Sequence, residues 1–448
     1  MSHSSPFKPI ANLVVRHLPT ASINPDASNP RSHKPPQVAA IARSIKAFGF
    51  NVPILIDGMG TVIAGHGRLA AAKKLGLADV PTIMVEHLSD TQRKAYMIAD
   101  NRLTDLSRWD DQLLGEILRD LSVAELEFEL DTIGFSVGEI DFRIEALGQQ
   151  SADNLADGPV ELAATPVSVE GDLWHCGQHR LLCGDALDPV AWGQLMSGKL
   201  AVLGFTDPPY NVKVHGHVSG LGKVRHREFA MASGEMARDE FIAFLEASFG
   251  LMAKHSIPAS IHFAAMDWQH SPEMIAAGEA VFTELKNICV WQKPSGGMGA
   301  LYRSQHEFFF VWKNGRGKHR NNVELGRNGR NRSNIWEYPS AAGFRRSEGG
   351  DLLATHPTCK PVALVADAIL DVSKRGEIVI DPFMGSGTTI IAAERVRRVA
   401  YGMELDPLYV DAALRRFEKL TGQEATHDDG RTLTQVAAER ASCIGEAA

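Results

Sequence analysis

The chain has 448 residues, enough for two or three domains with buried cores, and a net charge of −8. That charge excludes a polycation that coats nucleic acid over its whole surface, although a local basic site is still compatible with it. No stretch approaches the roughly 18 apolar residues that cross a bilayer, and the five cysteines are scattered, as in reducing compartments. Because the first residues also lack the pattern of a signal peptide, we expect a cytoplasmic protein that binds no membrane.

The first hundred residues predict a compact α/β unit. Apolar residues at helical spacing follow a pair of prolines at 35–36 and stop at Gly49. Two short apolar strands then flank the turn at 58–60, which is a hairpin signal. The segment 65–68, Gly-His-Gly-Arg, opens a second helix, and one more strand and helix follow. We therefore predict a small N-terminal α/β domain at residues 1–104.

Beyond this unit the chain changes character twice. Residues 105–165 contain a helical pattern and then a small, polar stretch that is typical of a linker. From 166 to 423, apolar strands alternate with helical patterns, which favours an α/β domain with a Rossmann-like, doubly wound and mostly parallel sheet. The predicted strands end at Cys183, Thr206, Ala265, Trp291, Ile380 and Met403. Residues 424–448 are polar, and we expect them to form a frayed tail.

The segment Asp207-Pro208-Pro209-Tyr210 follows an apolar strand at 201–205. Its two prolines force a rigid, extended exit that has no backbone N–H donors. Ligands sit outside the carboxyl ends of strands in such sheets, so this position suits a site. The Asp207 carboxylate and the Pro208 carbonyl can accept hydrogen bonds from an amino group, and Tyr210 offers a face for a planar ring. The alternative is a strand terminator with a packed tyrosine.

A second group of residues begins with the apolar strand at 377–380. It runs into Asp381-Pro-Phe-Met-Gly-Ser-Gly387, a turn that opens a helix in the manner of a cofactor cradle. The turn lacks the lysine of a phosphate-binding loop and the third glycine of a dinucleotide-binding motif. About twenty residues later another apolar strand ends in Glu404, a carboxylate suited to ribose hydroxyls.

Four segments together resemble the motifs of S-adenosylmethionine-dependent DNA amino-methyltransferases. They are Asp207–Tyr210, His356–Pro361, Asp381–Thr389 and Glu404. Their order, with the acceptor motif first and the donor motif last, resembles the beta class of that family. The resemblance implies methyl transfer from S-adenosylmethionine to the exocyclic amino group of a DNA base that has been flipped out of the duplex.

The resemblance also implies roles for individual residues. The segment Asp207-Pro208-Pro209-Tyr210 would be catalytic, with Asp207 and the Pro208 carbonyl accepting from the target amino group and Tyr210 stacking on the base. Contacts to the cofactor are expected from Asp185, Thr358, Lys360, Asp381, Phe383, Gly385, Gly387 and Glu404. No metal ion is expected, because the sulfonium is itself the leaving group. The histidines and cysteines at 175–183 are interpreted as residues of a core strand and not as zinc ligands.

Arginine and asparagine abound between residues 290 and 345, where this family keeps its target-reading region. Their side chains suit guanine and adenine edges and phosphates. The predicted contacts to DNA are Arg303, Arg316, Arg320, Arg327, Arg330 and Arg332. The alternative is a basic loop that faces only water.

The N-terminal unit resembles the first domain of ParB-type partition proteins. The resemblance rests on Asn29-Pro-Arg31, the strand at 53–56 and Gly65-His-Gly-Arg68. In that family a Gly-Glu-Arg-Arg motif binds nucleotide phosphates at a helix start, and here only Arg68 matches one of its arginines. The resemblance implies a phosphate contact by Arg68. Double-stranded DNA is thus the expected partner, and a nucleotide at the first domain and a second copy of the chain are further candidates.

The target base is predicted to be adenine. An Asp at position 207 resembles the adenine-N6 enzymes, whereas the cytosine-N4 enzymes more often carry Ser there, so cytosine-N4 is the first alternative. A second alternative is a ParB-like DNA-binding protein with an inactive methyltransferase half. A third is methyl transfer to RNA or protein. The chain has no obvious nuclease signature, and we expect a modification enzyme of the stand-alone or phage type.

Overall fold

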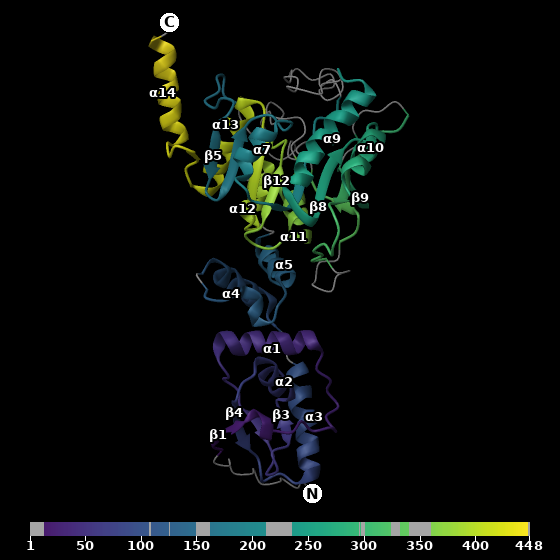
Figure 1. Ribbon diagram of the computed structural model, residues 1–448, viewed down its shortest axis with the longest axis vertical. Coiled ribbons are helices and arrows are strands. Elements are labelled where there is room, and N and C mark those ends of the chain that lie inside the picture. Colours follow the sequence, from purple (N-terminus) through teal and green to yellow (C-terminus); the bar gives the residue numbers. More distant parts are fainter. Residues whose placement is uncertain are drawn as a thin grey trace. The chain divides into compact units, whose positions relative to one another are not determined.

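The computed structural model describes residues 13–106, 109–124, 126–148, 162–211, 235–294, 296, 301–323, 332–339 and 360–446. The chain divides into two compact units, Met1–Leu147 and Gly148–Ala448 (Figure 1). None of the helices in the described ranges combines the length and the apolar character that crossing a membrane requires.

The first unit is built around a four-stranded sheet with the order β1-β4-β2-β3. Strand β2 is parallel to β4, and the other two pairs are antiparallel. In chain order its elements are β1 (Val15–Pro19), a 3-10 turn (Thr20–Ser22), α1 (Pro35–Phe48), β2 (Ile54–Ile56), β3 (Val62–Ala64), α2 (His66–Leu75), β4 (Asp79–Met84), α3 (Asp90–Leu106), α4 (Asp111–Val123), a second 3-10 turn (Leu130–Ile133) and α5 (Val137–Gly148).

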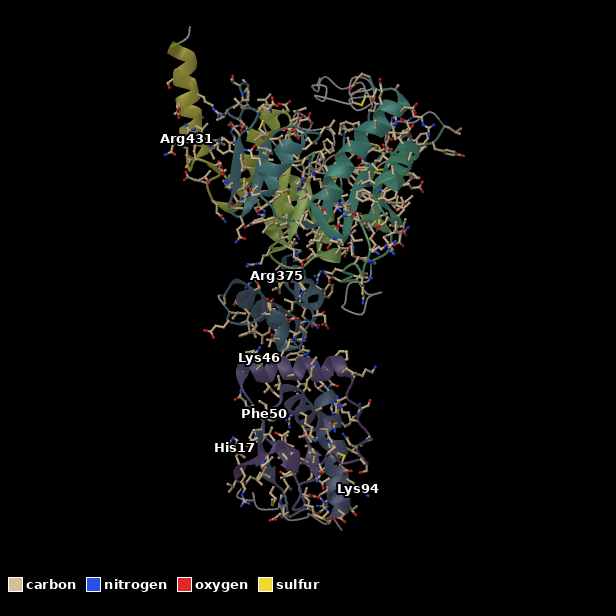
Figure 2. The ribbon with its side chains drawn as sticks, viewed as in Figure 1. His17, Lys46, Phe50, Lys94, Arg375 and Arg431 are labelled. Carbon is tan, nitrogen blue, oxygen red and sulfur yellow. The ribbon has the colours of Figure 1, made fainter. Side chains whose placement is uncertain are left out.

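Local chemistry explains the hairpin of this unit. The Asp57 carboxylate accepts hydrogen bonds from the backbone N–H groups of Met59 (2.9 Å) and Thr61 (2.8 Å), which closes the turn between β2 and β3. Ile54 and Leu69 pack in the buried core, with the partly buried Phe50 against it (Figure 2). The predicted α/β character of this unit is confirmed.

Helices α4 and α5 have a small core of their own. Leu114 and Leu118 of α4 and Ile140 of α5 are buried together. The Asp110 side chain accepts from the backbone N–H of Leu113 at 3.1 Å and so caps the start of α4. In the structure both helices belong to the first compact unit.

The described part of the second unit holds a ten-stranded sheet with the order β11-β9-β10-β8-β7-β12-β13-β6-β5-β14. Within it, β10 and β5 run antiparallel to their neighbours, and the pairs from β8 through β7, β12 and β13 to β6 are all parallel. Its elements are β5 (Leu173–Cys176), β6 (His179–Cys183), α7 (Pro189–Met196), β7 (Ala201–Thr206), α9 (Arg238–Lys254), β8 (Ser256–Met266), α10 (Ser271–Val281), β9 (Glu284–Gln292), β10 (His306–Lys313), β11 (Ile335–Glu337), α11 (Val362–Val372), β12 (Ile378–Asp381), α12 (Thr388–Arg395), β13 (Val399–Glu404), α13 (Pro407–Thr421), β14 (Thr426–His427) and α14 (Leu433–Glu446).

Both faces of this sheet are covered by helices. Along β8, Phe263 packs into one hydrophobic cluster, with α11, α12 and α13, while its neighbour Ala264 packs into the other, with α7, α9 and α10. This alternation is the period of two that a strand imposes on its side chains. The predicted doubly wound, mostly parallel sheet is confirmed.

The chain order reverses between β7 and β12. From β7 the chain continues to β8 on one side, whereas from β12 it continues to β13 on the other, and β7 and β12 are adjacent parallel strands. Ligands of doubly wound sheets bind at such a switch point, outside the carboxyl ends of the strands.

The end of the chain corrects one expectation. In place of a frayed tail, β14 pairs with β5 as an edge strand of the sheet, and α14 follows it. The side chain of Arg440 on α14 donates to both carboxylate oxygens of Asp172, at 2.6 and 2.9 Å, and Arg431 pairs with Asp429 beside α14 (Figure 2). The polar composition suggested disorder, but the buried Ala425 and Val436 anchor this segment.

Candidate active site

Carboxylates gather where the parallel strands end. Asp207 follows β7, Asp381 ends β12, Glu404 ends β13 and Asp185 follows β6. Because adjacent strands of a sheet lie roughly 5 Å apart and these four run in parallel, their carboxyl ends share one edge. The charges of Asp207 and Glu404 both act on Asp381. The acceptor and donor segments therefore face the same edge at the switch point.

The acceptor segment is held by hydrogen bonds among its own side chains. The Tyr210 hydroxyl donates to Asp207 Oδ1 at 2.8 Å, and Asn211 exchanges bonds with the backbone of Met236. Burial, and then the Asp207 charge, raise the pKa of Tyr210 well above its usual value, so the phenol stays protonated and donates. Pro208 is buried, which leaves the segment little freedom to move.

Lys360 lies beside the acceptor segment. Its ammonium is 2.6 Å from Asp207 Oδ2, 3.2 Å from the Tyr210 hydroxyl and 3.1 Å from Glu307 Oε2. Lys360 was predicted to contact the cofactor, whereas its contacts in the described part of the chain are with the acceptor side of the site. Thr358, the other predicted cofactor residue of that motif, lies outside the described residues.

Glu307 and Lys293 are site residues that sequence analysis missed. Strand β10 is antiparallel to β8 and β9, so its first residues lie at the edge where those strands end. This places the buried Glu307 next to Lys360, and Lys293 Nζ is 2.5 Å from its other oxygen. The one available signal was an acidic residue at the start of the apolar run Phe308–Val311.

The donor turn is tied to β13 and to the end of β12. Gly385 N–H donates to Glu404 Oε2 at 2.8 Å, and Met384 N–H donates to the Met403 carbonyl at 2.8 Å. Within the turn, the Thr389 hydroxyl donates to Asp381 Oδ2 at 2.6 Å. These bonds fix the carboxylate of Glu404, the residue predicted to contact the ribose, next to the turn.

Gly387 is required by the shape of this turn. It has φ of +84° and is the residue before α12, and a Cβ added there would lie 2.8 Å from Cβ of Ala413 on α13. Arg416, also on α13 and not predicted as a site residue, donates to the Ser386 carbonyl and the Thr388 hydroxyl, both at 3.1 Å. Helix α13 therefore packs against the turn and supports it.

Two further predicted cofactor residues lie next to this turn. Phe383 packs against Phe244 of α9, with ring centroids 5.8 Å apart. The Asp185 carboxylate accepts from Leu187 N–H at 2.9 Å, and the preceding Gly184 N–H donates to the Glu404 carbonyl at 3.0 Å. The structure thus brings Asp185, Phe383 and Glu404 to the same edge as Asp381.

The predicted DNA contacts separate into groups. Arg303 is exposed and precedes β10, at the edge that carries the site. Arg316 and Arg320 follow β10, at the opposite edge, where Arg320 pairs with Glu377 at 3.1 Å. Arg327 and Arg330 lie outside the described residues.

Arg332 has a structural role that was not anticipated. Its guanidinium donates to the Tyr338 hydroxyl (2.8 Å) and Asp367 (3.0 Å), and its Nε is 2.8 Å from Asp371. A side chain with these partners holds β11 against α11. The composition of this segment did not predict these ion pairs, because ion pairing depends on the tertiary fold.

In the first unit, Arg68 turns back toward its own domain. Its guanidinium donates to the Pro53 carbonyl at 3.3 Å, and burial lowers its pKa. The neighbouring His66 accepts from the backbone N–H of Asp26 at 3.3 Å.

His179 of the second unit is a buried core residue that bonds to Ala400 N–H and Glu394.

Comparison with known proteins agrees with these two units. Residues 202–415 match a family model described as DNA methylase, and residues 8–101 match one described as ParB N-terminal domain. A ParB-like nuclease domain-containing protein, YnaK of Escherichia coli, is 43% identical over 82 residues, which are 18% of this chain and 94% of YnaK. The chain joins a ParB N-terminal domain to a DNA methylase domain.

Two further relatives concern the methylase domain. Type II methyltransferase M2.MboI of Moraxella bovis is 28% identical over 145 residues, 31% of this chain. The matched part spans only about half of that enzyme, 51% of its length. The structure of a DNA modification methylase from Thermus thermophilus, complexed with S-adenosyl-L-methionine, covers 55% of this chain and 96% of its own, with 20% identity and a TM-score of 0.39.

Proposed function

We propose that the methylase domain transfers a methyl group from S-adenosylmethionine to the N6 amino group of adenine in double-stranded DNA. The observation that supports this proposal most is the adjacency of β7 and β12, which brings the acceptor segment and the donor turn to one edge. M2.MboI, a methyltransferase by name, is consistent with it.

The acceptor residues suit activation of an aromatic amine. The lone pair of such a nitrogen is conjugated into the ring, so it is a weak nucleophile. Asp207 and the Pro208 carbonyl would accept its two N–H bonds and favour the positive charge that develops during transfer, which is electrostatic preorganisation. Because a stacked base cannot reach this edge, the target would leave the duplex and stack on Tyr210.

The donor residues fit the proposed cofactor. Glu404 accepts two backbone N–H bonds, and its carboxylate keeps lone pairs for ribose hydroxyls. Asp381 and Asp185 add acidic groups where a cationic ligand would bind, and Phe383 would pack against it. When bound, the cofactor supplies an electrophilic methyl group on a sulfonium.

Adenine is preferred over cytosine because an Asp leads the acceptor segment. Sequencing the methylated bases of DNA from cells that express the chain tests both the base and the recognition site. N6-methyladenine is the expected product, and N4-methylcytosine would favour the first alternative. Label found only in RNA or protein would contradict DNA as the substrate.

The decisive variant is Asp207→Asn. It keeps the shape of the side chain but removes the charge that stabilises the transition state, so we expect methyl transfer to fall roughly 10²–10³-fold with DNA affinity little changed. Incorporation of labelled methyl groups into DNA measures this, with Asp239→Asn, at an exposed position of α9, as the matched control. Equal rates in wild type and Asp207→Asn would contradict the proposed site.

For the first unit we propose a nucleotide whose phosphates bind at the start of α2. Arg68 supports this, because its half-buried guanidinium has an Nε without a hydrogen-bond partner among the described residues. Backbone N–H groups at the start of a helix attract anions.

A further inference from the structure

A buried ammonium lies between two carboxylates at the acceptor edge. Lys360 is 5% exposed, and its three N–H donors have three acceptors within reach, namely Asp207, Glu307 and Tyr210. Glu307 is also buried and takes Lys293 on its second oxygen. Two carboxylates and two ammonium groups thus balance their charges in this cluster.

This arrangement leaves Asp207 occupied. Its Oδ1 accepts from the Tyr210 hydroxyl, and its Oδ2 accepts from the Lys360 ammonium at 2.6 Å. A neutral amino group that approaches Oδ2 would compete with a charged donor, which makes the stronger hydrogen bond. Target binding at Asp207 is therefore opposed unless Lys360 has another partner.

Glu307 is the group placed to be that partner. Its Oε2 is already 3.1 Å from the Lys360 ammonium, only slightly farther than Asp207 Oδ2. A small shift of the ammonium toward Glu307 keeps it paired inside the protein, which a buried charge requires. The same shift releases Oδ2 of Asp207.

We propose that Glu307 is a positioning residue that draws Lys360 away from Asp207 when the target amino group arrives. Before that arrival, the Lys360 ammonium occupies the hydrogen-bonding position of the target amino group, and it then yields that position. The inference rests on the proposed function and adds to it two residues, Glu307 and Lys360, that act before the chemical step.

The proposal predicts strong coupling between the two residues. Glu307→Gln removes the competing charge but keeps the shape, so Lys360 stays on Asp207, and we expect methyl transfer to DNA to fall at least about tenfold. Lys360→Met alone leaves one negative charge unbalanced, because Lys293 still pairs with Glu307, and is also expected to lose activity. The double variant restores charge balance, and its activity should exceed the product of the two single effects by about tenfold or more.

Controls separate positioning from a merely structural role. S-adenosylmethionine affinity, measured by titration calorimetry on the full chain, should change less than about twofold in Glu307→Gln. Additive losses in the cycle, or a matching loss of cofactor affinity and melting temperature in Glu307→Gln, would overturn the proposal. If one of the single variants fails to fold, the activity of the double variant can still be measured, because its charges are balanced.

A structural measurement tests the same point without turnover. In crystals of the full chain soaked with adenosine, the distance from Lys360 Nζ to Asp207 Oδ2 should exceed roughly 3.5 Å, the limit of a hydrogen bond. A base bound to Asp207 with Lys360 still in place contradicts the inference alone. If the wild-type chain neither binds the base nor methylates DNA, the proposed function fails and the inference fails with it.

Discussion

The ionisation of Asp381 should make the stability of the protein depend on pH. Burial raises its pKa from 3.8 to about 7, and the nearby charges of Asp207 and Glu404 act in the same direction. The folded chain therefore holds a proton that the unfolded chain releases above about pH 4. The stability that this proton contributes is full at low pH and is lost as the pH rises through about 7.

We predict that Asp381→Asn removes this dependence. The amide cannot ionise, so the free energy of unfolding of the variant should not show the decrease between about pH 4 and 7, which is on the order of a few kcal/mol in the wild type. Urea denaturation of both proteins at a series of pH values measures it. Parallel curves for the two proteins would show that Asp381 titrates normally.

At the level of elements, the donor turn depends on its contact with α13. We predict that Gly387→Ala lowers the free energy of unfolding by about 2–5 kcal/mol, because it combines a disfavoured backbone angle with a steric overlap. It should also weaken cofactor binding.

Gly422 offers the matched control for that variant. It has φ of +72° and no atom within 4 Å of an added Cβ. Gly422→Ala should therefore cost only about 1–2 kcal/mol and leave cofactor affinity unchanged. Thermal denaturation compares the stability of the two variants, and titration calorimetry compares their affinity for the cofactor. Similar cofactor affinities in both variants would argue against a role of the turn in cofactor binding.

The two edges of the large sheet allow a prediction about DNA. Arg303→Ala, at the site edge, should weaken DNA binding and reduce the slope of log affinity against log salt by about 1. Arg320→Ala should instead lower stability, because it breaks the pair with Glu377, and leave the slope unchanged. Fluorescence anisotropy with duplex DNA at several salt concentrations measures both slopes. A reduced slope in Arg320→Ala alone would show that the DNA binds at the opposite edge of the sheet.

The same elements show how much of the fold could be predicted from the sequence. Strand ends such as Thr206 and Ile380 were predicted within one residue, because an apolar run stopped by Asp, Pro or Gly is a local signal. The contact between Glu307 and Lys360 was not predicted, because residues so far apart in the sequence meet only through the tertiary fold, in which β10 runs antiparallel to β8. The ion pairs of Arg332 were not predicted for a related reason, since its acidic partners lie on α11.

At the scale of the whole molecule, each unit has its own hydrophobic core. We predict two calorimetric unfolding transitions for the full chain. S-adenosylmethionine at about 100 times its dissociation constant should stabilise one of them by roughly 2.7 kcal/mol. A nucleoside triphosphate should shift only the other, and Arg68→Ala should abolish that shift. A single transition that responds to both ligands would contradict independent units.

The adjacency of β7 and β12 has a consequence for how the protein is made. These strands are neighbours in space, yet Thr206 and Ile378 are separated by most of the methylase domain. Pairing across such a distance has a high contact order, which slows folding. During synthesis on the ribosome, the two strands cannot pair until the residues of β12 have emerged, so the nascent chain stays catalytically silent up to that point.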